Sequence, residues 1–312
     1  MSGVELYAPR RARHRRTWTA AALALVLVFA IAGQALGVLP AVMAGFIDLK
    51  GGARDWPQVV YLLIVGFGAA ALVTFAWVWL FERRGLREIG FNSRGAVRFL
   101  RGYGVGLAFL CVVVGIIAAI GGYTVEGPGA LGTAAAGAAL VPILALMAGF
   151  IIQGSTEEIL FRGWLMQVIA SRHGIWLALI LNSVVFSLMH AGNIEPSREL
   201  WLGLANIVLF GVFISLYALR EGSLWGVCGW HAAWNWLLGV GFGLEVSGQP
   251  LPTSPLVVDL ATNAQTPWWL TGAAFGPEAS VITTGVLVVG SAVLLLRGRT
   301  RDHGVVGLGV RG

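Results

Sequence analysis

The sequence predicts an all-α protein, a polytopic transmembrane bundle of about eight helices. Of its 312 residues 57% are hydrophobic and only 12% are charged, whereas a soluble domain carries about 25% charged residues. The apolar residues also gather in separate runs, and roughly 20 apolar residues suffice to cross a bilayer. These observations together predict an integral membrane protein whose main partner is the lipid bilayer.

Eight apolar runs define the expected helices. We place the spans at about 18–39, 57–81, 102–123, 135–161, 175–191, 200–219, 223–243 and 279–297. They form a single transmembrane domain, residues 18–297, because the sequence shows no internal repeat and no linker. Residues 1–17 and 298–312 are expected to be basic cytoplasmic tails.

The basic residues predict the orientation of the chain. The pI is near 10.0, but 18 of the 21 lysines and arginines fall on one side of the predicted membrane. Cytoplasmic loops collect such residues, so we expect both termini in the cytoplasm and no nucleic-acid partner. The use of 20 arginines and one lysine points to a bacterium with a GC-rich genome, and therefore to a bacterial plasma membrane.

A polar stretch inside the fourth span organises the expected site. Residues 149–164 read GFIIQGSTEEILFRGW, in which Glu157 and Glu158 precede Arg162. An acidic residue at the centre of a membrane helix costs roughly 2.5–3.5 kcal/mol, so two of them need compensation. Glu158 and Arg162 are four residues apart, a spacing that puts them on one helix face.

Two later spans carry polar pairs at the same spacing. Phe186 and His190 form one pair, and His231 and Asn235 form the other. Each pair lies on one face of its helix. Three helices therefore each offer a polar face, and together they predict one buried site.

The residue types suit hydrolysis inside a membrane. A carboxylate can take a proton from water, an imidazole can orient water or bind a metal, and amide and imidazole groups can donate to an oxyanion. Each feature alone also has a structural interpretation, as a helix-stabilising ion pair or a packed aromatic. Phe186 fits core packing, and Cys228, three residues before His231, fits packing better than metal binding.

The sequence leaves a metal open. His190, His231 and Glu157 are the ligand types of a catalytic zinc, so a divalent metal such as zinc would bind there. Against this, Arg162 adds a positive charge nearby and the chain lacks H-E-x-x-H. We therefore favour metal-free activation of water over a metal.

Three motifs resemble a known family, the CAAX-protease and bacteriocin-processing (CPBP, or Abi) family of intramembrane endopeptidases. EEILFR (157–162) resembles its E-E-x-x-x-R, FSLMH (186–190) its F-x-x-x-H, and HAAWN (231–235) its H-x-x-x-N. The resemblance covers about 140–240 and implies an eight-helix hydrolase, a protease that cleaves peptide or protein substrates at the membrane.

The resemblance also implies roles for the site residues. Glu157 would be the general base, assisted by His190, with Glu158 and Arg162 in support. His231 and Asn235 would stabilise the oxyanion. Members of the family are described as metalloproteases, although a metal-independent glutamate mechanism has been argued as well.

A non-enzymatic alternative uses the same residue types. Intramembrane acids and histidines also mark proton relays, so a proton or small-solute carrier, or an immunity-type scaffold, would carry a similar site. Carriers often show internal repeats, which this sequence does not. We therefore favour the peptidase, and the sequence does not reveal its natural substrate.

Overall fold

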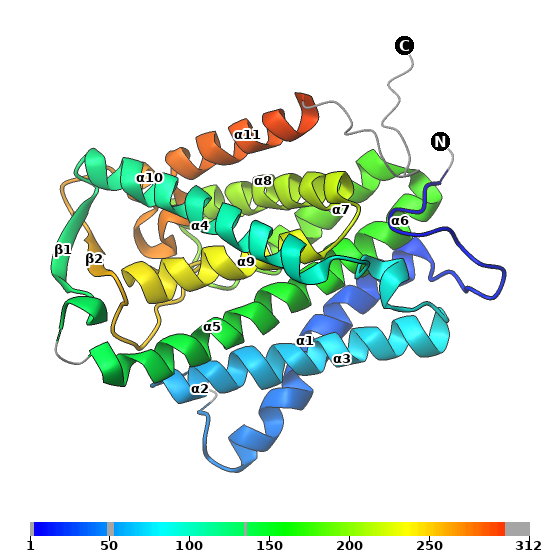
Figure 1. Ribbon diagram of the computed structural model, residues 1–312, viewed down its shortest axis with the longest axis horizontal. Coiled ribbons are helices and arrows are strands. Elements are labelled where there is room, and N and C mark those ends of the chain that lie inside the picture. Colours follow the sequence, from blue (N-terminus) through cyan, green and yellow to red (C-terminus); the bar gives the residue numbers. More distant parts are fainter. Residues whose placement is uncertain (1–2, 49–52, 134–135, 297–312) are drawn as a thin grey trace.

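The computed structural model describes residues 3–48, 53–133 and 136–296 as a bundle of long helices with one small sheet (Figure 1). The α-helices are α1 (Thr19–Met43), α2 (Trp56–Tyr61), α3 (Phe67–Ala76), α4 (Gly95–Ala119), α5 (Ala136–Glu158), α6 (Met166–His173), α7 (Ile175–Leu188), α8 (Arg198–Glu221), α9 (Trp225–Trp236), α10 (Trp268–Thr271) and α11 (Val281–Leu296). Residues 298–312, expected as a second cytoplasmic tail, lie outside the described residues.

Short π-helical turns join or extend several of these α-helices. They are η1 (Leu62–Gly66), η2 (Trp77–Phe81), η5 (Ile159–Leu165) and η6 (Leu237–Gly241). As a result α2 to η2 form one rod, α5 to α6 a second, and α9 to η6 a third. 3₁₀ turns occupy η3 (Leu86–Ile89), η4 (Ala130–Gly132), η7 (Ala273–Phe275) and η8 (Pro277–Ala279).

The described helices confirm an all-α integral membrane protein. Five of them are long and apolar enough to cross a bilayer, and α7 and α11 are shorter apolar helices. The five are Thr19–Met43, Trp56–Phe81, Gly95–Ala119, Gly137–His173 and Arg198–Glu221. The count of eight spans stays a prediction.

Two helix boundaries differ more than the others from those predicted. The predicted third span began near residue 102, but α4 begins at Gly95, because Arg98 and Arg101 lower the local hydropathy without interrupting the helix. The predicted fourth span ended at 161, yet the rod continues to His173. Its 37 residues span about 55 Å at 1.5 Å per residue, well beyond the roughly 30 Å hydrocarbon core.

A two-stranded antiparallel sheet was not expected from the sequence. Strand β1 (Tyr123–Pro128) pairs with β2 (Val258–Thr262), with an irregularity between Val125 and Gly127. The strands are short and far apart in the chain, so hydropathy alone does not reveal them. In Figure 1 they lie at the opposite end of the molecule from α6 and residues 3–17. We call these two ends the sheet end and the tail end.

Glycines hold α9 tightly between α4 and α5. A Cβ atom at Gly102 of α4 would overlap the carbonyl group of Gly226, and one at Gly229 would overlap the carbonyl of Phe99. On the other side of α9, a Cβ at Gly154 of α5 would lie 3.0 Å from the backbone nitrogen of Ala232. Small residues let helix backbones approach closely in membranes, and here they bring α9 against the polar stretch of α5.

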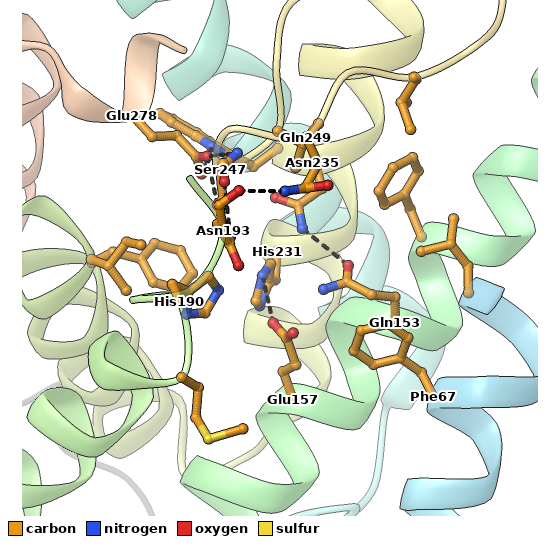
Figure 2. Close-up of a pocket in the computed structure, with 18 of the residues that line it drawn as sticks. Phe67, Gln153, Glu157, His190, Asn193, His231, Asn235, Ser247, Gln249 and Glu278 are labelled. Carbon is orange, nitrogen blue, oxygen red and sulfur yellow. Dashed lines mark hydrogen bonds and ion pairs between the residues drawn. The ribbon is translucent and has the colours of Figure 1, made fainter. Parts of the chain in front are cut away.

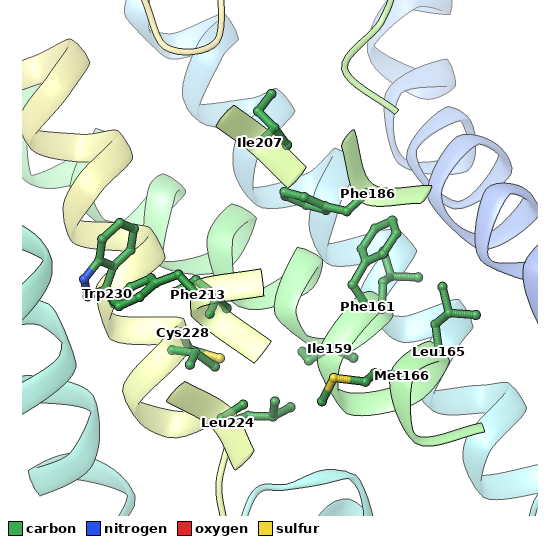
Figure 3. Packing of buried hydrophobic residues seen from close by; sticks show 14 of the residues in the cluster. Ile159, Phe161, Leu165, Met166, Phe186, Ile207, Phe213, Leu224, Cys228 and Trp230 are labelled. Carbon is green, nitrogen blue, oxygen red and sulfur yellow. The ribbon is translucent and has the colours of Figure 1, made fainter. Parts of the chain in front are cut away.

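An apolar core surrounds the contact between these helices. Large buried side chains from η5, α7, α8 and α9 interdigitate there, and Cys228 is only 1% exposed among them (Figure 3). This burial agrees with the packing interpretation of Cys228. Residues 3–17 cover the tail end of the same core, where Val4 N donates a hydrogen bond of 2.9 Å to the carbonyl oxygen of Ala170.

The separation of charge between the two ends predicts membrane topology. Among the described residues, only Arg54 and Arg198 lie at the sheet end. The other surface arginines lie in residues 3–17, in the segment between η2 and α4, in the first turns of α4, and near the ends of α6 and α8. Reporter fusions ending at residue 92 should therefore read as cytoplasmic, and fusions ending at residue 260 as external. Alkaline phosphatase and green fluorescent protein fusions provide the measurement. External phosphatase activity from the residue 92 fusion would contradict this orientation.

Candidate active site

A cavity of about 670 Å³ lies between α5, α7, α8 and α9 and receives four of the six predicted site residues (Figure 2). Glu157, His190, His231 and Asn235 line it. The other two, Glu158 and Arg162, lie behind its wall with fully buried side chains. The structure thus gathers residues from three separate motifs around one space.

A buried ion pair anchors the site. The Nη1 group of Arg162 donates to Oε1 of Glu158 at 3.1 Å, and both side chains are 0% exposed. The expected i, i+4 pair is therefore present, although Arg162 lies in the π-helical turn η5. A charge buried alone is strongly destabilising, so each member of this pair requires the other.

Aromatic rings cover the rest of the guanidinium group. The Cζ atom of Arg162 lies 4.5 Å from the ring centre of Phe186 and 5.7 Å from that of Phe210. Its Nε and Nη2 atoms have no hydrogen-bond partner among the described residues. Cation–π contacts of this kind are worth up to about 2 kcal/mol when desolvated. Phe186 therefore does more than fill the core, because its ring faces a buried charge.

His231 links the buried glutamate to the glutamate that faces the cavity. Its Nδ1 atom donates to Oε1 of Glu158 at 2.8 Å, and its Nε2 atom is 3.4 Å from Oε2 of Glu157. The bond to Glu158 sets the ring orientation and places a proton on Nδ1. The Nε2 atom is then presented to Glu157, whose side chain is 14% exposed.

His190 reaches the cavity from the turn that follows α7. The helix ends at Leu188, so His190 is not within it, and its Nδ1 atom lies 2.9 Å from the carbonyl oxygen of Phe186. A carbonyl oxygen only accepts, so Nδ1 carries the proton and Nε2 keeps its lone pair. No hydrogen bond or ion pair joins His190 to Glu157 within the described residues; the partner of Glu157 is His231.

Sequence reasoning missed Gln153. Its Oε1 atom accepts a hydrogen bond of 3.0 Å from Nδ2 of Asn235, and its side chain is 7% exposed in the cavity wall. Figure 2 shows its amide nitrogen directed towards the space beside His231 and Glu157. The signal was available, because Gln153 precedes Glu157 by four residues on the same helix face.

Glu278 is a second site residue that was not predicted. One of its oxygens accepts from Nε1 of Trp234 at 3.1 Å, and the other accepts from Oγ of Ser247 at 2.8 Å. It thereby holds the segment 246–252, most of which lines the cavity, against α9. Only the tertiary structure brings Glu278 here, since it lies far along the chain from every motif.

The expected metal ligands do not converge in this arrangement. Within the described residues, no group of three or more His, Cys, Asp or Glu side chains has the spacing of a metal site. His231 uses Nδ1 for Glu158 and turns Nε2 to Glu157. A zinc ion bound by His190, His231 and Glu157 would require these side chains to rearrange.

The fold and the cavity define a polytopic membrane protein with a buried Glu–His–Arg centre. Comparison with known protein families points to the same class of protein. The model of a family described as type II CAAX prenyl endopeptidase Rce1-like matches residues 138–237. The match covers 100 of the 312 residues and supports the resemblance to the CAAX-protease family that the three motifs predicted.

A curated relative is similar over a shorter region. Uncharacterized protein YyaK of Bacillus subtilis (strain 168) is 33% identical over 90 residues, which are 28% of this chain and 29% of the relative. The similarity spans less than a third of either protein. The relative is itself uncharacterized and assigns no activity.

The buried ion pair predicts a large effect on stability. Glu158→Gln leaves Arg162 without a counter-charge, so the free energy of unfolding should fall by about 3–5 kcal/mol. Thermal or denaturant unfolding of the purified protein in detergent measures the change.

A matched control comes from an exposed pair. Arg54→Ala breaks a pair with Asp48 in which the side chains are 69% and 49% exposed, and such pairs contribute about 0–1 kcal/mol. The double variant Glu158→Gln/Arg162→Gln should lose less stability than the two single variants together. Equal stability of Glu158→Gln and Arg54→Ala would contradict the role of the buried pair.

Proposed function

We propose that this protein is an intramembrane endopeptidase that cleaves membrane-associated peptides with a water molecule activated by Glu157. The observation that carries the proposal is the position of Glu157, which faces the cavity 3.4 Å from His231. His231 is itself held by a buried glutamate–arginine pair. A carboxylate beside a fixed imidazole is suited to move a proton to and from a reacting group.

In the proposed reaction, Glu157 takes a proton from water while the water oxygen attacks the carbonyl carbon of the peptide bond. The lone pair on Nε2 of His190 accepts a hydrogen bond from the second O–H group of the same water and so orients it, and that hydrogen stays on the oxygen. Glu157 then gives its proton to the leaving nitrogen as the carbon–nitrogen bond breaks. The products are a carboxylic acid and an amine, and the glutamate is regenerated.

Neighbouring donors would stabilise the oxyanion. Asn235 uses one amide hydrogen for Gln153 and keeps the other, while the amide nitrogen of Gln153 is directed towards the same space. His231 adds a donor at Nε2 when its ring is protonated. Donors held in place before the reaction are most effective in a site of low dielectric, such as this one.

Substitution of the proposed base tests this function. Glu157→Gln should lower kcat/KM about 10²–10⁴-fold, the usual contribution of a general base. His231→Ala should cause a similar loss, and the double variant should be little worse than either single variant because the two residues act as one unit. Cleavage of a library of membrane-anchored peptides by purified protein in liposomes, read by mass spectrometry, measures the rates.

The control for this experiment is Glu126→Gln, which changes an exposed carboxylate in β1 and should leave cleavage unchanged. Wild-type turnover by Glu157→Gln would remove the proposed base. Failure of the wild-type protein to cleave any peptide, with proton uptake that depends on Glu157, would support the carrier instead.

Chelation distinguishes glutamate from metal chemistry. Because the proposed steps use only side chains of this protein, cleavage should continue after treatment with a strong zinc chelator. Elemental analysis of active protein, followed by chelation and zinc add-back, provides the measurement. Stoichiometric zinc whose removal abolishes cleavage, and whose return restores it, would show that the metal interpretation is correct.

A further inference from the structure

The cavity extends to the sheet end of the molecule. Its lining there comes from the connections between helices, namely Ala53, Asn193, residues 246, 247 and 249–252, and Glu278. Its inner lining comes from helix interiors and includes Phe67, Phe210 and Leu287 together with Glu157. A peptide that enters from the sheet end would therefore pass the connections between helices first and reach Glu157 last.

The tail end of the site is closed. The side chains of Glu158 and Arg162 lie between Glu157 and the tail end, and both are fully buried. Residues 3–17 close the layer beneath, and Tyr7 donates a hydrogen bond of 3.1 Å to the carbonyl oxygen of Arg162. A peptide could not reach Glu157 from this side without separating the buried ion pair.

The cavity wall is negatively charged. Its ionisable side chains, apart from two histidines, are Glu157 and Glu278, and the lining contains no lysine or arginine. The hydrogen-bond donors to Glu278 are the indole of Trp234 and the hydroxyl and amide groups of Ser247, which are all neutral. No cation of the described chain is therefore paired with Glu278.

The described residues of the sheet end as a whole carry the same sign of charge. Among the described residues of the sheet end, the bases are Arg54 and Arg198, whereas acids are more numerous. These acids are Asp48, Asp55, Glu126, Glu195, Glu199, Glu245 and Asp259. A cleft lined by one sign of charge with apolar walls concentrates ligands of the opposite sign.

We propose that the cavity admits a positively charged peptide segment from the sheet end, which the distribution of arginines places outside the cytoplasm. The proposal rests on the proposed endopeptidase function and narrows its substrate class. A free C-terminal carboxylate meets two glutamates and no basic side chain in this cavity. The favoured substrate is thus an internal, lysine- or arginine-bearing segment on the external side of the membrane.

Charged thiol reagents test both parts of the proposal at once. A cysteine is introduced as Gln153→Cys, or separately as Met189→Cys, both in the cavity lining. The background is Cys111→Ala, which leaves only Cys228, a residue that is 1% exposed. Full-length protein in right-side-out or inside-out vesicles is treated with cationic trimethylammonium-ethyl or anionic sulfonatoethyl methanethiosulfonate, neither of which crosses membranes.

We expect both reporters to react from the external face only. Each labelling rate is divided by the rate at which the same reagent reacts with a small free thiol in solution. After this normalisation, the cationic reagent should react about tenfold or more faster than the anionic reagent. Glu278→Gln in the same background should reduce that preference. Gln153→Cys removes the hydrogen bond from Asn235 and could prevent folding. Met189→Cys then provides the measurement, because Met189 makes no hydrogen bond to Asn235.

Two surface positions serve as controls for sidedness. Ala264→Cys, exposed in the turn after β2, should react from the external face with a smaller charge preference, and Ala12→Cys, exposed at the tail end, only from the other face. Cavity reporters that react from the same face as Ala12→Cys would overturn the direction of entry. Equal normalised rates for the two reagents would overturn the charge preference. Thiol labelling needs no catalysis, so these outcomes are independent of whether the protein cleaves peptides.

Discussion

The contact among Arg162, Glu158 and His231 constrains the rest of the structure. An arginine within a membrane helix costs roughly 2.5–3.5 kcal/mol on insertion scales, and this one is fully buried. Its charge is tolerable only where a carboxylate and aromatic faces surround it. The carboxylate comes from its own helix, but Phe186 comes from α7, Phe210 from α8 and His231 from α9. Three further helices must therefore converge on one arginine.

The tail end supports this centre with further buried polar contacts. Tyr7 donates to the carbonyl group of Arg162. Burial first, and then the charge of Glu158, raise the pKa of Tyr7, so its hydroxyl stays protonated and remains a donor. A second buried pair, Glu82 with Arg84, accepts a hydrogen bond from Thr17 and another from Trp164 of η5. The segment before α1 is thus tied to the helix that carries the site.

The two ends of the molecule consequently differ in how their interior is packed as well as in charge. At the tail end, cations are paired with buried acids or gathered on the surface, and the interior is closed. At the sheet end, connections held by Glu278 and Asn193 frame an open, acidic cavity. Amides from Gln153 and Asn235 stand between that opening and the glutamates. A peptide that entered through the opening would therefore meet the hydrogen-bond donors first and the titratable groups afterwards. Such an arrangement suits a site that binds a peptide backbone before proton transfer takes place.

The sequence by itself determined the membrane bundle, most helix boundaries and the identity of the polar residues. These features are local, since hydropathy needs only a run of about 20 residues and the Glu158–Arg162 contact needs only one helical turn. Helix ends were harder, as α4 and the α5–α6 rod show, because charged residues can continue a helix when the protein itself buries them.

Only the tertiary structure decided which polar groups meet. It paired Glu157 with His231 rather than with His190, and it brought Gln153 and Glu278 to the cavity. Spacing along one helix cannot predict such contacts, because they depend on how closely two helices approach. Here Gly154 sets that distance, since its missing side chain lets α9 lie against α5.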